Sequence, residues 1–255
     1  MLLNHREMGS GPALVILHGL FGSLDNWVTL GKQFAESHTV YLVDQRNHGR
    51  SPHGEPMDYA TMAEDLRLFF EEQGIRQATV LGHSMGGKTA MRFALDHPDL
   101  TEALIVADIA PKTYPPGHDT IFDALEKITP DQLGNRTEAD EQLGRWIPDA
   151  DVRQFLLKNL SRDPEGGYRW KMNLPVIQQE YAGILGFGAA DFAYDGPTLF
   201  VRGGRSNYVA DSDWPAIVQL FPRASLQTIP GAGHWLHAQQ PRAFFEAVQA
   251  FLKGL

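Results

Sequence analysis

The sequence predicts an α/β protein, built as a mostly parallel twisted sheet with helices on both faces. Short apolar runs alternate with longer amphipathic segments over the first 111 residues, and the alternation resumes after residue 195. The short runs carry apolar residues at consecutive positions, as strands buried on both faces do. With 255 residues, of which 43% are hydrophobic, the chain can bury one large core.

The individual elements follow from the spacing of the apolar residues. Continuous runs of Val, Ile, Leu and Ala predict strands, whereas apolar residues three or four positions apart predict helices. On this basis we expect strands at 13–17, 39–43, 78–81, 104–107, 197–201 and 224–228. We expect helices at 24–34, 59–72, 85–95 and 241–252.

The segment 112–195 interrupts this alternation. Its apolar residues keep a helical period, and it contains no clear strand. The helices expected there are 122–128, 138–146, 152–160 and 174–185. We therefore expect a core domain of residues 1–111 and 196–255, with a helical cap of residues 112–195 inserted into it. Such a cap should cover the carboxyl edge of the sheet, where open α/β folds bind their ligands.

The composition argues against several classes of partner. The 22 Lys and Arg against 31 Asp and Glu give a net charge of −9, which disfavours a nucleic-acid partner because phosphate binding needs clustered cations. The chain has no cysteine, so disulfides and thiolate metal sites are excluded, and its ten histidines show no HExxH-like grouping. We expect no metal and no cofactor.

The N-terminal residues lack the basic start and apolar stretch of a signal peptide. No segment approaches the roughly 20 apolar residues that cross a bilayer. We therefore expect a cytoplasmic protein without a membrane partner, either a monomer or a small homo-oligomer.

The most informative motif is Gly-His-Ser-Met-Gly at 82–86, which directly follows the strand expected at 78–81. A Gly-x-Ser-x-Gly pattern between a strand and a helix predicts a sharp turn that exposes the serine hydroxyl, because the flanking glycines allow close backbone approach. Ser84 is therefore the candidate nucleophile.

A serine hydroxyl needs a general base, because it is a weak nucleophile at neutral pH. His234 follows Gly231 and Gly233 in a loop between the last expected strand and the last helix, which places it at the same edge of the sheet as Ser84. The order serine, acid, histidine along the chain fits this assignment. His237, three residues later, is interpreted as a packing residue.

The acid that would orient His234 has several candidates. In many proteins with this strand order it follows the penultimate strand, but Ser206 stands near that position. Asp108 ends the strand beside the one that carries Ser84, and we favour it as the acid. Asp211 and Asp213 are the rivals, although their position before Trp214-Pro215 indicates helix capping. Ser206 is either a fourth member of the site or a loop turn.

An oxyanion hole needs two backbone N–H groups aimed at the developing negative charge. Met85 supplies one, as the first residue of its helix. The second is expected from Leu20, with Phe21 as the alternative, in the Gly-rich loop that follows the first long strand.

Several of these segments also fit other interpretations. Residues 82–89 also match G-x-x-x-x-G-K-T, a phosphate-binding loop, but a nucleotide site gives His234 and the loop at 18–22 no role. A binding protein without turnover is a third hypothesis. The charged segment 44–52 is interpreted as a turn pinned by side-chain hydrogen bonds. Arg202 and Arg205 either contact an acidic substrate group or are solvated.

The motifs together resemble the α/β-hydrolase superfamily over essentially the whole chain. They are His18-Gly19, Asp44-x-Arg46-x-His48-Gly49-x-Ser51, Gly82-His83-Ser84-Met85-Gly86-Gly87 and Gly233-His234. Residues 18–27, 108–111 and 202–208 are similar to the YbfF-type bacterial esterases and their mitochondrial relatives. The resemblance implies ester or thioester hydrolysis, Asp108 as the acid and Ser206 beside it in an extended triad. We expect the cap to be inserted after the sixth core strand.

We therefore expect a serine carboxylesterase that hydrolyses small-molecule acyl esters or thioesters through an acyl-enzyme intermediate. The apolar residues of the cap favour short to medium uncharged acyl chains. The residues expected to contact substrate are Phe21, Trp146, Phe187 and Trp235. Carbon–carbon bond hydrolysis, dehydration and haloperoxidation are alternatives, since the same triad supports them.

Overall fold

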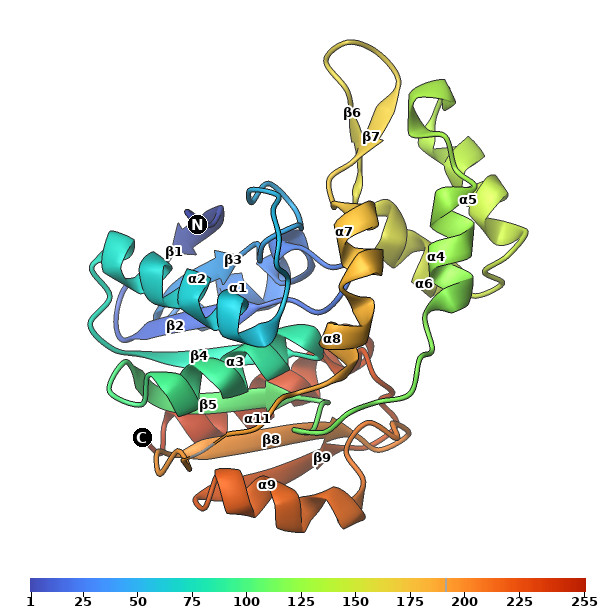
Figure 1. The fold of residues 1–255 in the computed structure, drawn as a ribbon. Coiled ribbons are helices and arrows are strands. Elements are labelled where there is room, and N and C mark those ends of the chain that lie inside the picture. The colour runs from blue at the N-terminus through green and yellow to red at the C-terminus, as the bar shows by residue number, and fades with distance from the viewer. Residues whose placement is uncertain (191) are drawn as a thin grey trace.

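The computed structural model describes residues 1–190 and 192–255 and is organised around a seven-stranded sheet (Figure 1). The strand order is β1-β3-β2-β4-β5-β8-β9. The edge strand β1 pairs antiparallel with β3, and the other pairings are parallel. The strands are β1 (His5–Met8), β2 (Ala13–Leu17), β3 (Thr39–Val43), β4 (Ala78–His83), β5 (Thr101–Ala107), β8 (Thr198–Gly203) and β9 (Ala224–Ile229). The predicted fold class is confirmed.

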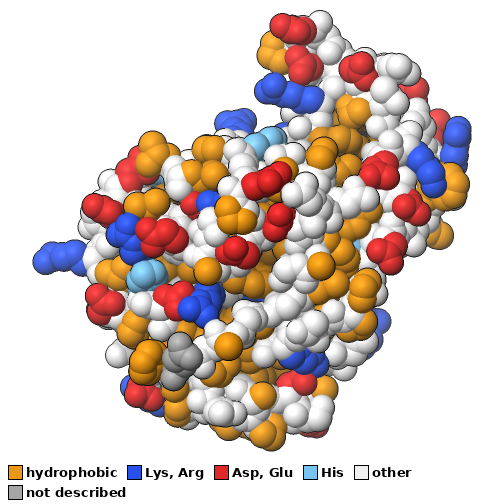
Figure 2. Space-filling view, in the orientation of Figure 1, with side chains coloured by type: hydrophobic (Ala, Val, Ile, Leu, Met, Phe, Trp, Pro, Cys, Tyr) orange, Lys and Arg blue, Asp and Glu red, His pale blue; other side chains and the backbone are white. Residues whose placement is uncertain are grey.

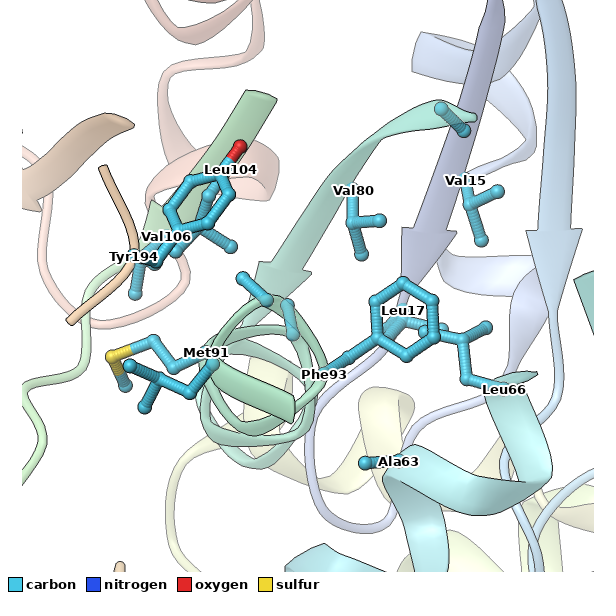
Figure 3. Packing of buried hydrophobic residues seen from close by; sticks show 14 of the residues in the cluster. Val15, Leu17, Ala63, Leu66, Val80, Met91, Phe93, Leu104, Val106 and Tyr194 are labelled. Atoms are coloured by element: carbon cyan, nitrogen blue, oxygen red, sulfur yellow. The ribbon is translucent and has the colours of Figure 1, made fainter. Parts of the chain in front are cut away.

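Helices cover both faces of this sheet. Successive residues of a strand point to opposite faces, so Val15 and Leu17 of β2 pack under α2 and α3, while Leu14 and Ile16 pack against α1 and α11. Figure 3 shows the first of these two layers, with Val15, Leu17 and Val80 facing Leu66 and Phe93. The core helices are α1 (Val28–Phe34), α2 (Tyr59–Gln73), α3 (Met85–Asp96), α9 (Trp214–Leu220), α10 (Leu236–Gln239) and α11 (Pro241–Leu252).

The inserted segment rises from the carboxyl edge of the sheet (Figure 1). Its apolar side chains form one cluster with Phe21, Met62 and Met85 of the core, so the cap is anchored directly above the sheet edge. Its elements are α4 (Asp119–Glu126), α5 (Arg136–Gly144), α6 (Ala150–Leu157), β6 (Leu160–Arg162), β7 (Tyr168–Trp170), α7 (Leu174–Gln179) and α8 (Tyr181–Leu185). The division into core and cap stays a prediction.

Three features differ from the sequence-based expectations. The cap contains an antiparallel hairpin, β6 and β7, whose three-residue strands are too short to show a periodic pattern. A break at Glu180 divides the helix expected at 174–185 into α7 and α8. The cap follows the fifth strand of the sheet and not the sixth, because a single short strand, β1, precedes β2. The sequence did not reveal β1, since three of its four residues are polar and none is buried.

Figure 2 shows acidic and basic side chains interspersed over one face of the molecule, with hydrophobic side chains gathered between the cap and the core. Among the helices that the structure describes, none has an apolar stretch long enough to span a bilayer.

Candidate active site

Ser84 lies at a sharp turn between β4 and α3. Its backbone has φ 53° and ψ −120°, a conformation that residues with side chains rarely adopt. A Cβ on Gly82 would lie 2.1 Å from the Gly86 carbonyl oxygen, and one on Gly86 would lie 2.5 Å from the His18 carbonyl oxygen. The two glycines are therefore required for the strand and the helix to approach, and the turn presents the half-buried Ser84 side chain at the sheet edge.

His234 connects Ser84 to a carboxylate. Its Nε2 lies 3.0 Å from Ser84 Oγ, and its Nδ1 lies 2.8 Å from Asp108 Oδ2. Because a carboxylate only accepts hydrogen bonds, the ring proton belongs on Nδ1, and Nε2 is free to accept the serine hydroxyl proton. The structure thus brings together three side chains that are separated by up to 150 residues.

Asp108 follows β5, is completely buried, and has a backbone φ of 53°. Its Oδ1 accepts a hydrogen bond of 2.9 Å from the Gly203 amide, and its Oδ2 accepts a second bond from the Ser206 hydroxyl. Together with the bond from His234, these contacts satisfy the buried carboxylate in its charged form. Ser206 therefore lies beside the acid, at the end of the penultimate strand.

The rival carboxylates lie elsewhere. Asp211 pairs with Arg202 at 2.6 Å, and its side chain is 88% exposed. Asp213 pairs with Lys112 at 2.6 Å and accepts a 2.8 Å bond from the Ala210 amide at the start of a short 3₁₀ turn. Neither side chain makes a cap hydrogen bond to α9, so the expected helix capping is not seen; Asp213 bonds within the turn before α9, and Asp211 pairs with Arg202.

Leu20 and Met85, the residues expected to supply the oxyanion donors, line the same cavity as Ser84. Met85 is the first residue of α3, where the helix leaves its N–H groups without intrahelical acceptors. The Phe21 amide donates to His48 Nε2 at 3.2 Å, and burial lowers the pKa of His48 to about 3, so its ring is a neutral acceptor. Within the described chain the Leu20 amide makes no hydrogen bond, which leaves it available.

The loop around Gly19 packs against the nucleophile turn. A Cβ on Gly19 would lie 3.0 Å from His83 Nδ1 and 3.2 Å from Ser84 Cβ. Burial lowers the pKa of the adjacent His18 to about 4, and its neutral ring accepts a 3.0 Å bond from the Gln45 amide. The segment 44–52 is held by side-chain hydrogen bonds, as predicted. The Asp44 carboxylate accepts bonds of 2.7 and 2.9 Å from the amides of Leu24 and Arg50.

Two residues near His234 were missed by the sequence reasoning. The Tyr208 ring stacks on the His234 imidazole, with ring centroids 3.7 Å apart. His83 Nε2 donates a 2.8 Å hydrogen bond to the His234 carbonyl oxygen, and burial holds the pKa of His83 well below its usual value, which keeps the ring neutral. Tyr208 could have been found from the sequence, because it lies two residues after Ser206, which was already a candidate for the site.

Two cavities adjoin Ser84, with volumes of about 420 and 230 Å³. The expected substrate residues Phe21 and Trp235 line the smaller cavity. Trp146 and Phe187 line neither, which corrects the expectation for both. Trp146 is 47% exposed at the end of α5, where Lys127 Nζ lies 3.6 Å from the centre of its ring. Phe187 follows the last cap helix and is buried in the core layer between the sheet and α2 and α3.

The phosphate-loop interpretation finds no support in this geometry. Gly82 lies within β4, and the residues from Met85 onward form α3, so the motif spans a strand and a helix and does not form a loop around an anion. Lys88 Nζ donates to the carbonyl oxygens of Leu185 and Gly186 at 2.8 and 2.6 Å.

A mostly parallel sheet with a serine at a strand-to-helix turn, and a histidine and a buried aspartate at the same edge, defines a hydrolase class. A sequence model of the alpha/beta hydrolase fold matches residues 12–241, and the chain belongs to this family. It is 43% identical to the mouse sn-1-specific diacylglycerol lipase ABHD11, covering 94% of this chain and 81% of that protein. It is 38% identical to the Escherichia coli esterase YbfF, covering 94% and 92% of the two chains.

A solved structure titled marine microorganism esterase superposes with a TM-score of 0.96 at 46% identity, covering 98% of this chain and 99% of the other. The predicted family, and the prediction of a carboxylic ester hydrolase, are confirmed at the level of the class.

Proposed function

We propose that this protein is a serine carboxylesterase with Ser84 as the nucleophile, His234 as the general base and Asp108 as the acid that orients His234. The observation that carries the proposal is the continuous hydrogen-bonded path from Ser84 Oγ through His234 to Asp108, with distances of 3.0 and 2.8 Å. Each group has the neighbour that its role requires.

In the first half-reaction, Ser84 Oγ attacks the acyl carbon of the ester while His234 Nε2 takes the hydroxyl proton. A C–O bond forms, and the carbonyl π electrons move to oxygen. The amides of Leu20 and Met85 stabilise this negative charge. When the intermediate collapses, His234 gives the proton to the departing alkoxide, and the acyl group stays on Ser84 as an ester.

In the second half-reaction, His234 takes a proton from water, and the resulting hydroxide oxygen attacks the acyl carbon. Collapse breaks the bond to Ser84 Oγ, which recovers its proton from His234, and the carboxylic acid leaves. Asp108 accepts the hydrogen bond from His234 Nδ1 in both half-reactions and stabilises the imidazolium. Ser206 and the Gly203 amide hold the carboxylate in place through their hydrogen bonds. Ser206 is therefore a positioning residue.

The two cavities support a small ester or thioester as the substrate. Their combined lining is mostly apolar and includes Met85, Ile109, Phe155 and Trp235. Cavities of this size bury most of the surface of a small ligand, so they suit acyl chains of short to medium length.

The test is hydrolysis of p-nitrophenyl esters and acyl-CoA thioesters of graded length by the wild type and Ser84→Ala. We expect turnover of esters by the wild type and loss of turnover in the variant. Equal rates in the two proteins would overturn the proposal, and the ratio of ester to thioester rates decides between the two substrate classes.

A further inference from the structure

The two cavities at Ser84 reach different catalytic groups. Five residues line both of them: Leu20, Ser84, Gly117, His118 and Tyr208. His234 lines the smaller cavity, together with Phe155 and Trp235. Among the described residues that line the larger cavity, His234 is absent. The two cavities therefore adjoin each other at the nucleophile, and we call them the larger and the smaller chamber.

This difference assigns the two halves of an ester to the two chambers. The general acid must reach the oxygen of the departing alcohol, because it protonates that oxygen as the intermediate collapses. His234 faces the smaller chamber, so the alcohol departs on that side. The acyl group, which stays on Ser84, then occupies the larger chamber of about 420 Å³.

The larger chamber has a basic lining. Its lining includes Lys88 and Lys112, and none of the described lining residues is Asp or Glu. This local excess contrasts with the net charge of −9 for the whole chain. Both ammonium groups lie near the Tyr114 ring, with Lys88 Nζ 4.8 Å and Lys112 Nζ 5.1 Å from its centre.

Neither ammonium group uses all of its hydrogen-bond donors within the protein. An ammonium group has three N–H donors. Lys88, which is 1% exposed, donates two bonds, to the carbonyl oxygens of Leu185 and Gly186 at the end of α8. Lys112, whose side chain is 35% exposed, donates one bond, to Asp213. Donors remain on both groups for an anion in the chamber.

Burial and the nearby Lys112 lower the pKa of Lys88 to about 7. Neutral carbonyl oxygens alone do not compensate the buried charge, whereas an anion in the chamber would. The uncompensated ammonium group of Lys88 agrees with a chamber that binds a negatively charged group.

We propose, resting on the serine esterase function above, that the larger chamber binds the acyl group and that Lys88 and Lys112 select acyl groups with a carboxylate at the far end. The preferred substrates are then monoesters of dicarboxylic acids. The smaller chamber takes the alcohol between Phe155 and Trp235. This specificity differs from the uncharged acyl chains that the apolar cap residues favoured.

The test compares matched ester pairs. Monoethyl succinate, monoethyl adipate and monoethyl suberate are each assayed beside the ethyl ester of the monocarboxylic acid with the same number of carbons, and kcat/KM is measured by titration of the released acid. We expect at least one carboxylate ester to be preferred by about tenfold or more, the size of effect that a charge-assisted hydrogen bond supplies.

Lys112→Gln is the main variant, because Lys88→Met also breaks two bonds between α3 and the cap. We expect Lys112→Gln to bring the ratio of the two kcat/KM values closer to one, since it lowers kcat/KM for the carboxylate ester more than for the uncharged ester. Asp213→Asn removes the partner of Lys112 and should raise the preference. Lys253→Gln, at the exposed C-terminus, is the matched control and should leave the preference unchanged.

Binding to the inactive protein separates this inference from the proposed function. Isothermal titration of Ser84→Ala with monoethyl adipate should show binding that the added Lys112→Gln change weakens by about tenfold, again the scale of one charge-assisted bond. If the wild type hydrolyses both esters of each pair equally and Lys112→Gln changes nothing, the lysine inference is wrong and the esterase stands. If neither ester is hydrolysed, the proposed esterase function is wrong. The calorimetry then tests by itself whether the larger chamber binds a carboxylate.

Discussion

The Tyr208 ring stacks on the His234 imidazole with ring centroids 3.7 Å apart and an angle of 16° between the planes. The Tyr208 carbonyl oxygen also accepts a 2.6 Å bond from the Tyr114 hydroxyl, which anchors the loop. His234 is therefore held by Asp108 at one ring nitrogen and by Tyr208 on one face. Stacking of this kind stabilises a ring in one orientation by about 0.5–1.5 kcal/mol.

We predict that Tyr208→Leu lowers kcat by about tenfold at most, because the lost stacking corresponds to that range of free energy. Tyr208→Phe keeps the aromatic face and should retain most of the activity. The measurement is kcat for a p-nitrophenyl ester with thermal unfolding of each variant as the control. Equal losses in the Phe and Leu variants would show that the hydroxyl group matters and the stacking does not.

The assignment of the acid predicts opposite outcomes for two aspartates. Asp108→Asn should lower kcat on the order of 10⁴-fold, the effect of the same change in a serine protease triad, because an amide favours the wrong tautomer of His234. Asp211→Asn should change it little, since Asp211 bonds to Arg202 on an exposed loop. A large loss in Asp211→Asn with an active Asp108→Asn would refute the assignment.

Ser206→Ala should give an intermediate effect. The variant removes one hydrogen bond to the Asp108 carboxylate but keeps those from Gly203 and His234. We predict a loss in kcat of about tenfold, consistent with one hydrogen bond to a charged group. Ser206→Thr retains a hydroxyl and should recover part of the rate. An unchanged kcat in Ser206→Ala would mean that Ser206 is only part of the loop turn.

The acyl chamber predicts a pH-dependent substrate preference. The pKa of Lys88 is lowered to about 7 by burial and by Lys112, so Lys88 is charged below that pH and neutral above it. The preference for monoethyl adipate over ethyl hexanoate should therefore fall as the pH rises through about 7. Taking the ratio cancels the pH dependence of the catalytic steps that both esters share.

Three neighbouring titratable groups of the chamber have their pKa values moved away from this range. Burial raises the pKa of Tyr59 and Tyr114 further above the ordinary tyrosine value, and burial lowers the pKa of His118 below its ordinary value of 6.5. We expect Lys88→Met to remove the pH dependence of the ratio. A ratio that varies equally with pH in Lys88→Met would assign the effect to another group.

The parts of the site that are determined by local sequence could be predicted. Gly82 and Gly86 are needed wherever a strand and a helix meet at a strained serine, so the motif alone located the nucleophile turn. Asp108 was predictable because parallel strands end at the same edge of the sheet. The helix at 241–252 was predicted with the bounds that the structure gives.

Contacts between distant segments could not be predicted in the same way. Lys88 and Lys112 belong to α3 and to the start of the cap, and only the folded chain brings them together near the Tyr114 ring. Trp146 and Phe187 were expected at the substrate because both are large and apolar, but residue type does not say which way a side chain faces. Trp146 faces outward, and Phe187 is used in the core.

The most direct test of the catalytic assignment is covalent labelling with a fluorophosphonate, which reacts with an activated serine. After brief exposure to the reagent, intact-mass measurement and peptide mapping should find a single adduct on Ser84 in the wild type. Ser84→Ala should show none, and His234→Ala should label far more slowly. Labelling of Ser84→Ala at the wild-type rate, or of His234→Ala as fast as the wild type, would contradict the account.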